Sequence, residues 1–138
     1  MQTDVNCIGY WCMKFVAILM LGLLATLASA QNSESVFSKM PESSWVMESE
    51  NAFVIEDKYP QAPVHLLVVS KEIIPNINYA SSELLQEMMI LARDAAKKYE
   101  IKESGYRIVI NTNREGGQSV YHLHIHVLGA RQMKWPPG

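Results

Sequence analysis

The sequence predicts one α+β domain in which an antiparallel sheet carries one main helix. Its 138 residues fit a single domain. Several short runs have the residue types of β-strands, and one longer run has helical periodicity. The order β-β-β-α-β-β with short links favours antiparallel neighbours in the sheet.

The first three strands are expected at residues 45–47, 52–55 and 64–69. Residues 59–63 form the loop before the third strand, because two prolines there cannot donate to a strand ladder. The polar, Ser-rich segment 31–41 is expected to be a loosely packed tether.

The helix is expected at residues 81–99. Ser81 can cap its first turn, where Glu83 is also favourable. Apolar residues recur at helical spacing and predict a buried stripe: Leu84, Met88, Leu91, Ala92, Ala95 and Tyr99. Two last strands, at 106–112 and 121–128, follow the helix, with the loop 113–119 between them.

Residues 1–30 have the pattern of a secretory signal peptide. Lys14 precedes a short apolar run, and Ala-Ser-Ala follows it at 28–30, which predicts cleavage after Ala30. A start at Met13 gives the cleaner leader, because the residues before it contain Asp4 and no basic residue. The alternative is a buried N-terminal helix.

The leader predicts a secreted or extracytoplasmic protein whose mature domain spans residues 31–138. The apolar run is shorter than the roughly 20 residues of a spanning helix, so no stable membrane span is expected. Both cysteines, Cys7 and Cys12, lie in the leader, and the mature domain needs no disulfide. The net charge of −2 offers no basic footprint for duplex nucleic acid.

Three of the four histidines alternate at the end of the chain: His122, His124 and His126. Because strand side chains alternate between faces, these histidines should share one face, while the apolar residues between them enter the core. A row of three imidazoles is unusual as mere solvated surface, and it indicates a functional site.

The pattern alone leaves two chemistries open. Three imidazoles are a common zinc set, with a fourth position for water. A neutral imidazole can also act as a nucleophile when its neighbours fix its tautomer. The strand contains no Asp, Glu or Cys to complete a metal shell, which favours catalysis without a metal.

The preceding loop adds an anion-binding hypothesis. Residues 116–119 read Gly-Gly-Gln-Ser, and two glycines can turn successive backbone N–H groups toward a phosphate. Ser119 could then donate to a phosphate oxygen or to a leaving group. The alternative is a plain connection between two strands.

Three segments together resemble the histidine triad (HIT) superfamily, and its Hint branch of histidine triad nucleotide-binding proteins in particular. Residues 117–129 read Gly-Gln-Ser-Val-Tyr-His-Leu-His-Ile-His-Val-Leu-Gly and resemble the triad motif. Residues 131–138, Arg-Gln-Met-Lys-Trp-Pro-Pro-Gly, and residues 57–65, Asp-Lys-Tyr-Pro-Gln-Ala-Pro-Val-His, resemble that branch as well. The resemblance covers residues 37–138.

The resemblance implies a HIT-like fold whose five-stranded antiparallel sheets join across a homodimer. It implies a hydrolase of purine nucleoside phosphoramidates that acts through a covalent nucleotidyl-histidine intermediate, with no metal or other cofactor. Segment 37–50 is shorter than in the family, which leaves the base preference open. A secreted member departs from a mostly intracellular family.

Residue roles follow from the same resemblance. His124 is the nucleophile, and His126 holds its other ring nitrogen or the phosphate. His122 and His65 support the row, and Ser119 also lies near the departing nitrogen. The implied nucleotide-binding residues are Asp57 at the ribose, Asn111, Gln118 and Ser119 at the phosphate, and Trp135 in the partner's site.

Two other functions compete with this one. The chain could be an exported nucleotide-binding or scaffold protein with little turnover, or a metal-dependent hydrolase that uses the same histidines. Turnover of adenosine phosphoramidate would separate the hydrolase from the scaffold.

Overall fold

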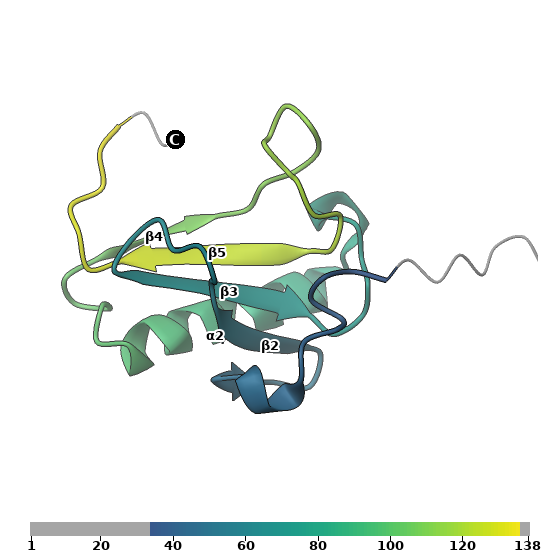
Figure 1. The fold of residues 1–138 in the computed structure, drawn as a ribbon, viewed down its shortest axis with the longest axis horizontal. Coiled ribbons are helices and arrows are strands. Elements are labelled where there is room, and N and C mark those ends of the chain that lie inside the picture. The colour runs from purple at the N-terminus through teal and green to yellow at the C-terminus, as the bar shows by residue number, and fades with distance from the viewer. Residues whose placement is uncertain (1–33, 136–138) are drawn as a thin grey trace, which may run out of the picture. The chain divides into compact units, whose positions relative to one another are not determined.

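The computed structural model describes residues 34–135, so the predicted leader lies outside the described part (Figure 1). The described chain is an α+β domain with a five-stranded antiparallel sheet in the order β1-β2-β3-β5-β4 and one long helix, which confirms the predicted fold class. The strands are β1 (Met47–Glu48), β2 (Ala52–Glu56), β3 (Val64–Ser70), β4 (Tyr106–Val109) and β5 (His124–Gly129). The helices are α2 (Ser82–Lys98) and two short 3-10 helices, η1 (Glu42–Ser44) and η2 (Ile77–Tyr79).

Helix α2 covers one face of the sheet (Figure 1). Ser81 caps it by accepting a hydrogen bond from the Leu84 amide at 3.2 Å, as the sequence predicts. The buried stripe of α2 packs against the alternate residues of the central strands that face it: Leu66, Val68, Ile125 and Val127. This contact forms the main hydrophobic core.

The opposite face of the sheet carries the histidines. In the register of β3 with β5, Leu67 lies beside His126 and Val69 lies beside His124. A second, smaller core forms on this face from Phe37, Phe53, Ile55, Leu67 and Val69. The sheet therefore separates the helix-packed core from the histidine side of the molecule.

The polar segment before β1 is packed, which corrects the prediction of a loose tether. Phe37 belongs to the smaller core with only 8% of its surface exposed, and Ser35 is 9% exposed. The Phe37 ring packs against the rings of His122 and His124, and the sequence pattern of the segment does not indicate these contacts. We call residues 34–40 the N-terminal arm.

The last strand begins later than predicted. Residues 121–123 precede the strand, and the Leu123 amide donates to the Ile74 carbonyl in the connection that follows β3, while the Leu123 carbonyl accepts from the amide of Ser70 at the end of β3. His122 is therefore held in irregular backbone just before β5. β4 likewise ends at Val109 rather than at residue 112.

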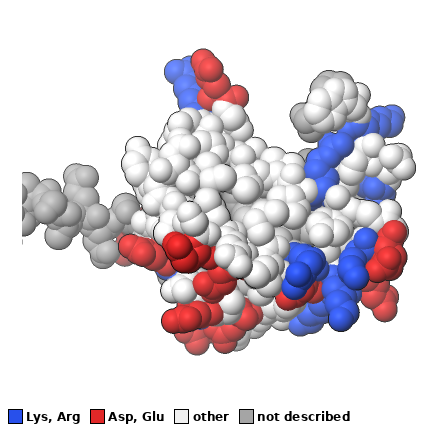
Figure 2. Space-filling model, turned by 180° about the vertical axis from the view of Figure 1, so that it is seen from behind, with Lys and Arg blue, Asp and Glu red and all other residues white. Residues whose placement is uncertain are grey.

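Seen from behind, acidic side chains gather at one end of the surface, whereas basic side chains lie beside acidic ones at the other end (Figure 2). Helix α2 has Glu83 in its first turn and Lys97 and Lys98 in its last. Among residues 34–135, no helix combines the length and the apolar character needed to cross a bilayer.

Candidate active site

The structure brings His122, His124 and His126 together at one end of β5 and buries them more than predicted. His122 is only 1% exposed and His124 only 7%, whereas the sequence pattern predicts an outward-facing row. The N-terminal arm is the reason, because the Phe37 ring lies 5.7 Å from the His122 ring and 5.1 Å from the His124 ring.

One hydrogen bond fixes the tautomer of His124. Its Nδ1 lies 2.6 Å from the backbone carbonyl oxygen of His122. A carbonyl oxygen only accepts, so Nδ1 carries the proton, and Nε2 of the neutral ring keeps its lone pair. The backbone carbonyl of His122 thus binds Nδ1 of His124, the nitrogen for which the resemblance implies a contact with His126. His124 has the tautomer of a nucleophile.

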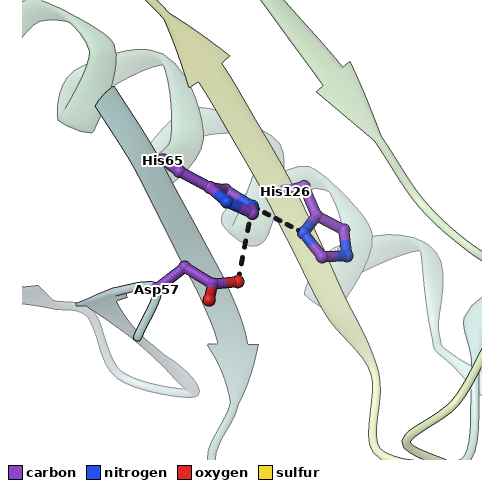
Figure 3. A group of neighbouring side chains, drawn as sticks. All are labelled: Asp57, His65 and His126. Carbon is purple, nitrogen blue, oxygen red and sulfur yellow. Dashed lines mark hydrogen bonds and ion pairs between the residues drawn. The ribbon is translucent and has the colours of Figure 1, made fainter. Parts of the chain in front are cut away.

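A chain of hydrogen bonds orders His65 and His126 (Figure 3). The Gln61 amide donates to Nδ1 of His65 at 3.1 Å, so the proton of neutral His65 is on Nε2. The Nε2 atom of His65 lies 2.9 Å from Nδ1 of His126 and 3.5 Å from an Asp57 carboxylate oxygen. His126 then accepts at Nδ1 and carries its own proton on Nε2.

The Nε2 atom of His126 is buried and has no hydrogen-bond partner within residues 34–135. A buried N–H without a partner is costly, and such a group marks a place where a ligand atom can accept it. The ring of His126 lies 5.0 Å from that of His124, so this donor lies beside the ring of His124.

Burial favours the neutral form of three imidazoles, those of His65, His122 and His126. Desolvation, with the neighbouring histidines, lowers the pKa of His126 to about 4. Burial also lowers the pKa of His122, and it lowers the pKa of His65 although the Asp57 carboxylate opposes that shift. The ring nitrogens of these three residues therefore keep the tautomers set by their hydrogen bonds at neutral pH.

His122 has both ring nitrogens occupied. Its Nε2 lies 2.7 Å from the Ser70 carbonyl oxygen and its Nδ1 lies 2.7 Å from the Ser35 hydroxyl. The carbonyl can only accept, so Nε2 donates to it and Nδ1 accepts from Ser35. His122 is therefore a fixed support of the row.

The loop before the row does not form the predicted cradle of amides. The Gly117 amide donates to Arg114, and the Gln118 amide donates to Asn113. Gly117 has a φ of 75°, and a Cβ at Gly116 would collide with the Thr112 backbone. The glycine pair thus permits a tight turn, which is the plain alternative.

The side chain of Gln118 is also engaged within this loop. It donates to the carbonyls of Pro75 and Val120 and accepts from the Asn113 amide at 2.8 Å. The side chain of Gln118 therefore holds the loop together. Ser119, the next residue, is exposed.

A cavity of about 450 Å³ opens beside His126 and His65. Its other polar lining residues are Gln61, Asn111, Arg107, Arg131 and Lys134. Three of them are cationic and none of the lining residues is acidic, so the cavity favours a ligand with negative charge. Asn111 thus lines this cavity, whereas Trp135 is 84% exposed in the single chain.

Asp57 is half-buried at the edge of this group. One carboxylate oxygen accepts from the Tyr59 amide at 2.7 Å, and the other faces His65. Each carboxylate oxygen has a second lone pair, so these contacts leave acceptor capacity for a ribose hydroxyl.

Asp57, His65 and His126 are close enough to hold a metal ion, with one ligand atom from each within 4.8 Å of the others. The hydrogen bond from Gln61 argues against this use. A metal on Nε2 of His65 requires Nδ1 to carry the proton, but Nδ1 already accepts from the Gln61 amide. The donor set does not fit a resident metal.

The sequence pattern missed four residues of the site. Ser35 and Phe37 come from a polar arm without periodicity, and Gln61 acts through its backbone amide. Arg107 reaches the cavity from β4. The alternation of β4 could have indicated Arg107, since Arg107 pairs with Leu128 on the histidine side of β5.

Comparisons with known proteins agree with this geometry. The family model of the HIT domain matches residues 38–133. An uncharacterized HIT-like protein of Synechococcus elongatus is 46% identical over 96 residues, which cover 67% of this chain and 83% of the relative. A maize (Zea mays) protein named 14 kDa zinc-binding protein is 39% identical over 123 residues, which cover 83% of this chain and 95% of the relative.

Solved structures show the same fold. A HIT family hydrolase from Legionella pneumophila is 43% identical, with a TM-score of 0.71 over 76% of this chain and 100% of the other. A HIT family hydrolase from Clostridium thermocellum is 34% identical, with a TM-score of 0.68 over 74% of this chain and 95% of the other.

Proposed function

Because the chain belongs to the histidine triad (HIT) family, we propose that it is a Hint-type nucleotide hydrolase that cleaves purine nucleoside phosphoramidates. The observation that carries the proposal is the hydrogen bond from His124 Nδ1 to the His122 carbonyl. It leaves a lone pair on Nε2 of a neutral imidazole, which is the nucleophile that this reaction requires. The Legionella and Clostridium relatives are both described as hydrolases.

The reaction has two displacements. In the first, Nε2 of His124 attacks the α-phosphorus, the bond from phosphorus to the leaving amine breaks, and the amine takes a proton. Ser119 is our candidate to deliver that proton. In the second, water attacks the nucleotidyl-histidine, the nucleoside monophosphate departs, and Nε2 regains its lone pair. A covalent intermediate divides one difficult step into two easier ones.

The neighbours stabilise the charge that develops on phosphorus. His126 presents a buried Nε2–H beside the nucleophile, and His65 fixes that tautomer from behind. The cationic cavity that Asn111 lines favours the same negative charge. Asp57 is the proposed acceptor for ribose hydroxyls.

We also propose a homodimer. β4 is one of the two edge strands of the sheet and lines the cavity, and an exposed edge has reason to pair with a second copy. The exposed Trp135 would then reach the partner's site. The leader at residues 1–30 supports export of the mature domain, and N-terminal sequencing of the native protein should begin at Gln31.

Turnover of adenosine phosphoramidate by the purified protein tests the function. We expect AMP and ammonia to form, and we expect the rate to survive exhaustive chelation. AMP binding without turnover would favour the scaffold function. Loss of the rate on chelation and its return with added zinc would favour the metal-dependent hydrolase. The maize relative is named a zinc-binding protein.

A further inference from the structure

The N-terminal arm touches the histidine row through a buried serine. The Ser35 hydroxyl lies 2.7 Å from Nδ1 of His122, across 87 residues of chain. The same oxygen accepts the Phe37 amide at 3.0 Å. Ser35 therefore joins the arm to the row at one point that solvent barely reaches.

The direction of this hydrogen bond follows from the far side of the His122 ring. Nε2 donates to the Ser70 carbonyl, so Nδ1 is the bare nitrogen and Ser35 must donate to it. The ring is thereby clamped between two residues from different parts of the chain. Without Ser35, a buried acceptor would lose its partner.

The clamp acts on the nucleophile through the backbone. The carbonyl of His122 is the group that holds the Nδ1 proton of His124, at 2.6 Å. Residues 121–123 lie outside the strand ladder, so the ladder does not fix this carbonyl directly. The peptide that bears this carbonyl is held by the Leu123 amide, which donates to the Ile74 carbonyl, and the anchored ring of His122 adds a second restraint.

Phe37 completes the arrangement. Its ring meets His122 edge-on and is tilted over His124, and its amide is the donor that orients the Ser35 hydroxyl. One short segment thus packs against both histidine rings and holds the Ser35 hydroxyl at Nδ1 of His122.

We propose that Ser35 is a positioning residue for His124, and that residues 35–37 hold the reactive tautomers of the triad. The activity part of this proposal rests on the proposed hydrolase function, whereas the tautomer part is independent of it. Ser35 touches neither substrate nor reacting atoms; it acts through His122.

The test compares Ser35→Ala with the matched control Ser44→Ala. Ser44 also lies in the N-terminal part of the chain, and its hydroxyl donates one hydrogen bond, to the Pro41 carbonyl at 2.7 Å. For Ser35→Ala we expect kcat to fall by about 3- to 10-fold, as for the loss of one ordinary hydrogen bond, with KM almost unchanged. Ser44→Ala should keep the wild-type kcat, and Ser35→Thr, which keeps the hydroxyl, should restore most of the loss.

Nitrogen-15 NMR of the histidine rings gives a readout without substrate. In the wild type, Nδ1 of His122 and Nε2 of His124 should give signals of unprotonated nitrogen. Ser35→Ala should shift the His122 Nδ1 signal and mix the two tautomers of His124, while Ser44→Ala leaves both unchanged. If the wild-type protein shows these signals but hydrolyses nothing, the hydrolase function fails and the clamp stands.

Three results would overturn the clamp. One is a Ser35→Ala protein with wild-type kcat and ring signals. Another is an equal loss in Ser44→Ala. The third is a folded Ser35→Thr protein that is as slow as Ser35→Ala, since a general packing defect would then explain the loss.

Discussion

At the scale of residues, His124 and His126 differ in which ring nitrogen carries the proton. His124 and His126 are both imidazoles on one strand, yet their hydrogen bonds place the protons on opposite ring nitrogens. His124 keeps a lone pair at Nε2, and His126 keeps a proton there. The proposed reaction uses this difference, with His124 attacking phosphorus and His126 donating to a phosphoryl oxygen.

The lowered pKa of His126 predicts a loss of stability in mild acid. In the unfolded chain this histidine binds a proton below its ordinary pKa of 6.5, whereas in the folded protein it does so only near 4. The unfolded state thus binds more protons between these values, and the free energy of unfolding falls as the pH drops through that window.

Urea unfolding of the wild type and of His126→Asn at a series of pH values measures this effect. The variant should show a flatter pH dependence between 6.5 and 4. His65 and His122 will keep part of the slope in both proteins, because their pKa values are lowered too. Parallel curves for the two proteins would show that His126 is not the group responsible.

At the scale of elements, the regular helix and strands could be predicted from the sequence, and the irregular segments could not. The helix and its Ser81 cap follow from local periodicity and capping chemistry. The arm could not be predicted, because Ser35 and Phe37 gain their contacts only after residues 87 positions away are folded beside them. At Gly116 and Gly117 the sequence could not distinguish a tight turn from an anion site, since both use glycine.

The cap makes a prediction for helix α2. Ser81→Ala removes the acceptor for the Leu84 amide and should lower the free energy of unfolding by about 1 kcal/mol. The kcat should not change, because α2 packs on the face opposite to the histidines. Ser82→Ala, one position later, is the control for chemical denaturation, and an equal loss there would show that the hydroxyl of Ser81 is not the cause.

At the scale of the whole molecule, the single chain leaves its cavity open along the edge strand β4. Val109 and Arg107 of β4 line it, and Trp135 is exposed. A second copy paired at this edge would enclose the site. We expect a dimer at micromolar concentration in analytical ultracentrifugation.

Mixed dimers test whether Trp135 serves the partner. Trp135→Ala should change the relative rates for different leaving groups with little loss of stability, because the side chain is exposed in the single chain. Mixing it with inactive His124→Asn should assemble some dimers in which an intact His124 faces an intact Trp135. These should recover the wild-type preference. A monomer with full activity, or no recovery on mixing, would refute the shared site.

The most direct measurement of the central claim is the capture of the covalent intermediate. The protein is mixed with a purine nucleoside phosphoramidate, quenched during turnover at alkaline pH, digested and analysed by mass spectrometry. The nucleotidyl group should be found on the peptide that contains His124, it should be lost in acid, and it should be absent from His124→Asn, which should also show no turnover. An adduct on another residue, or full turnover by the variant, would contradict the assignment of His124 as the nucleophile.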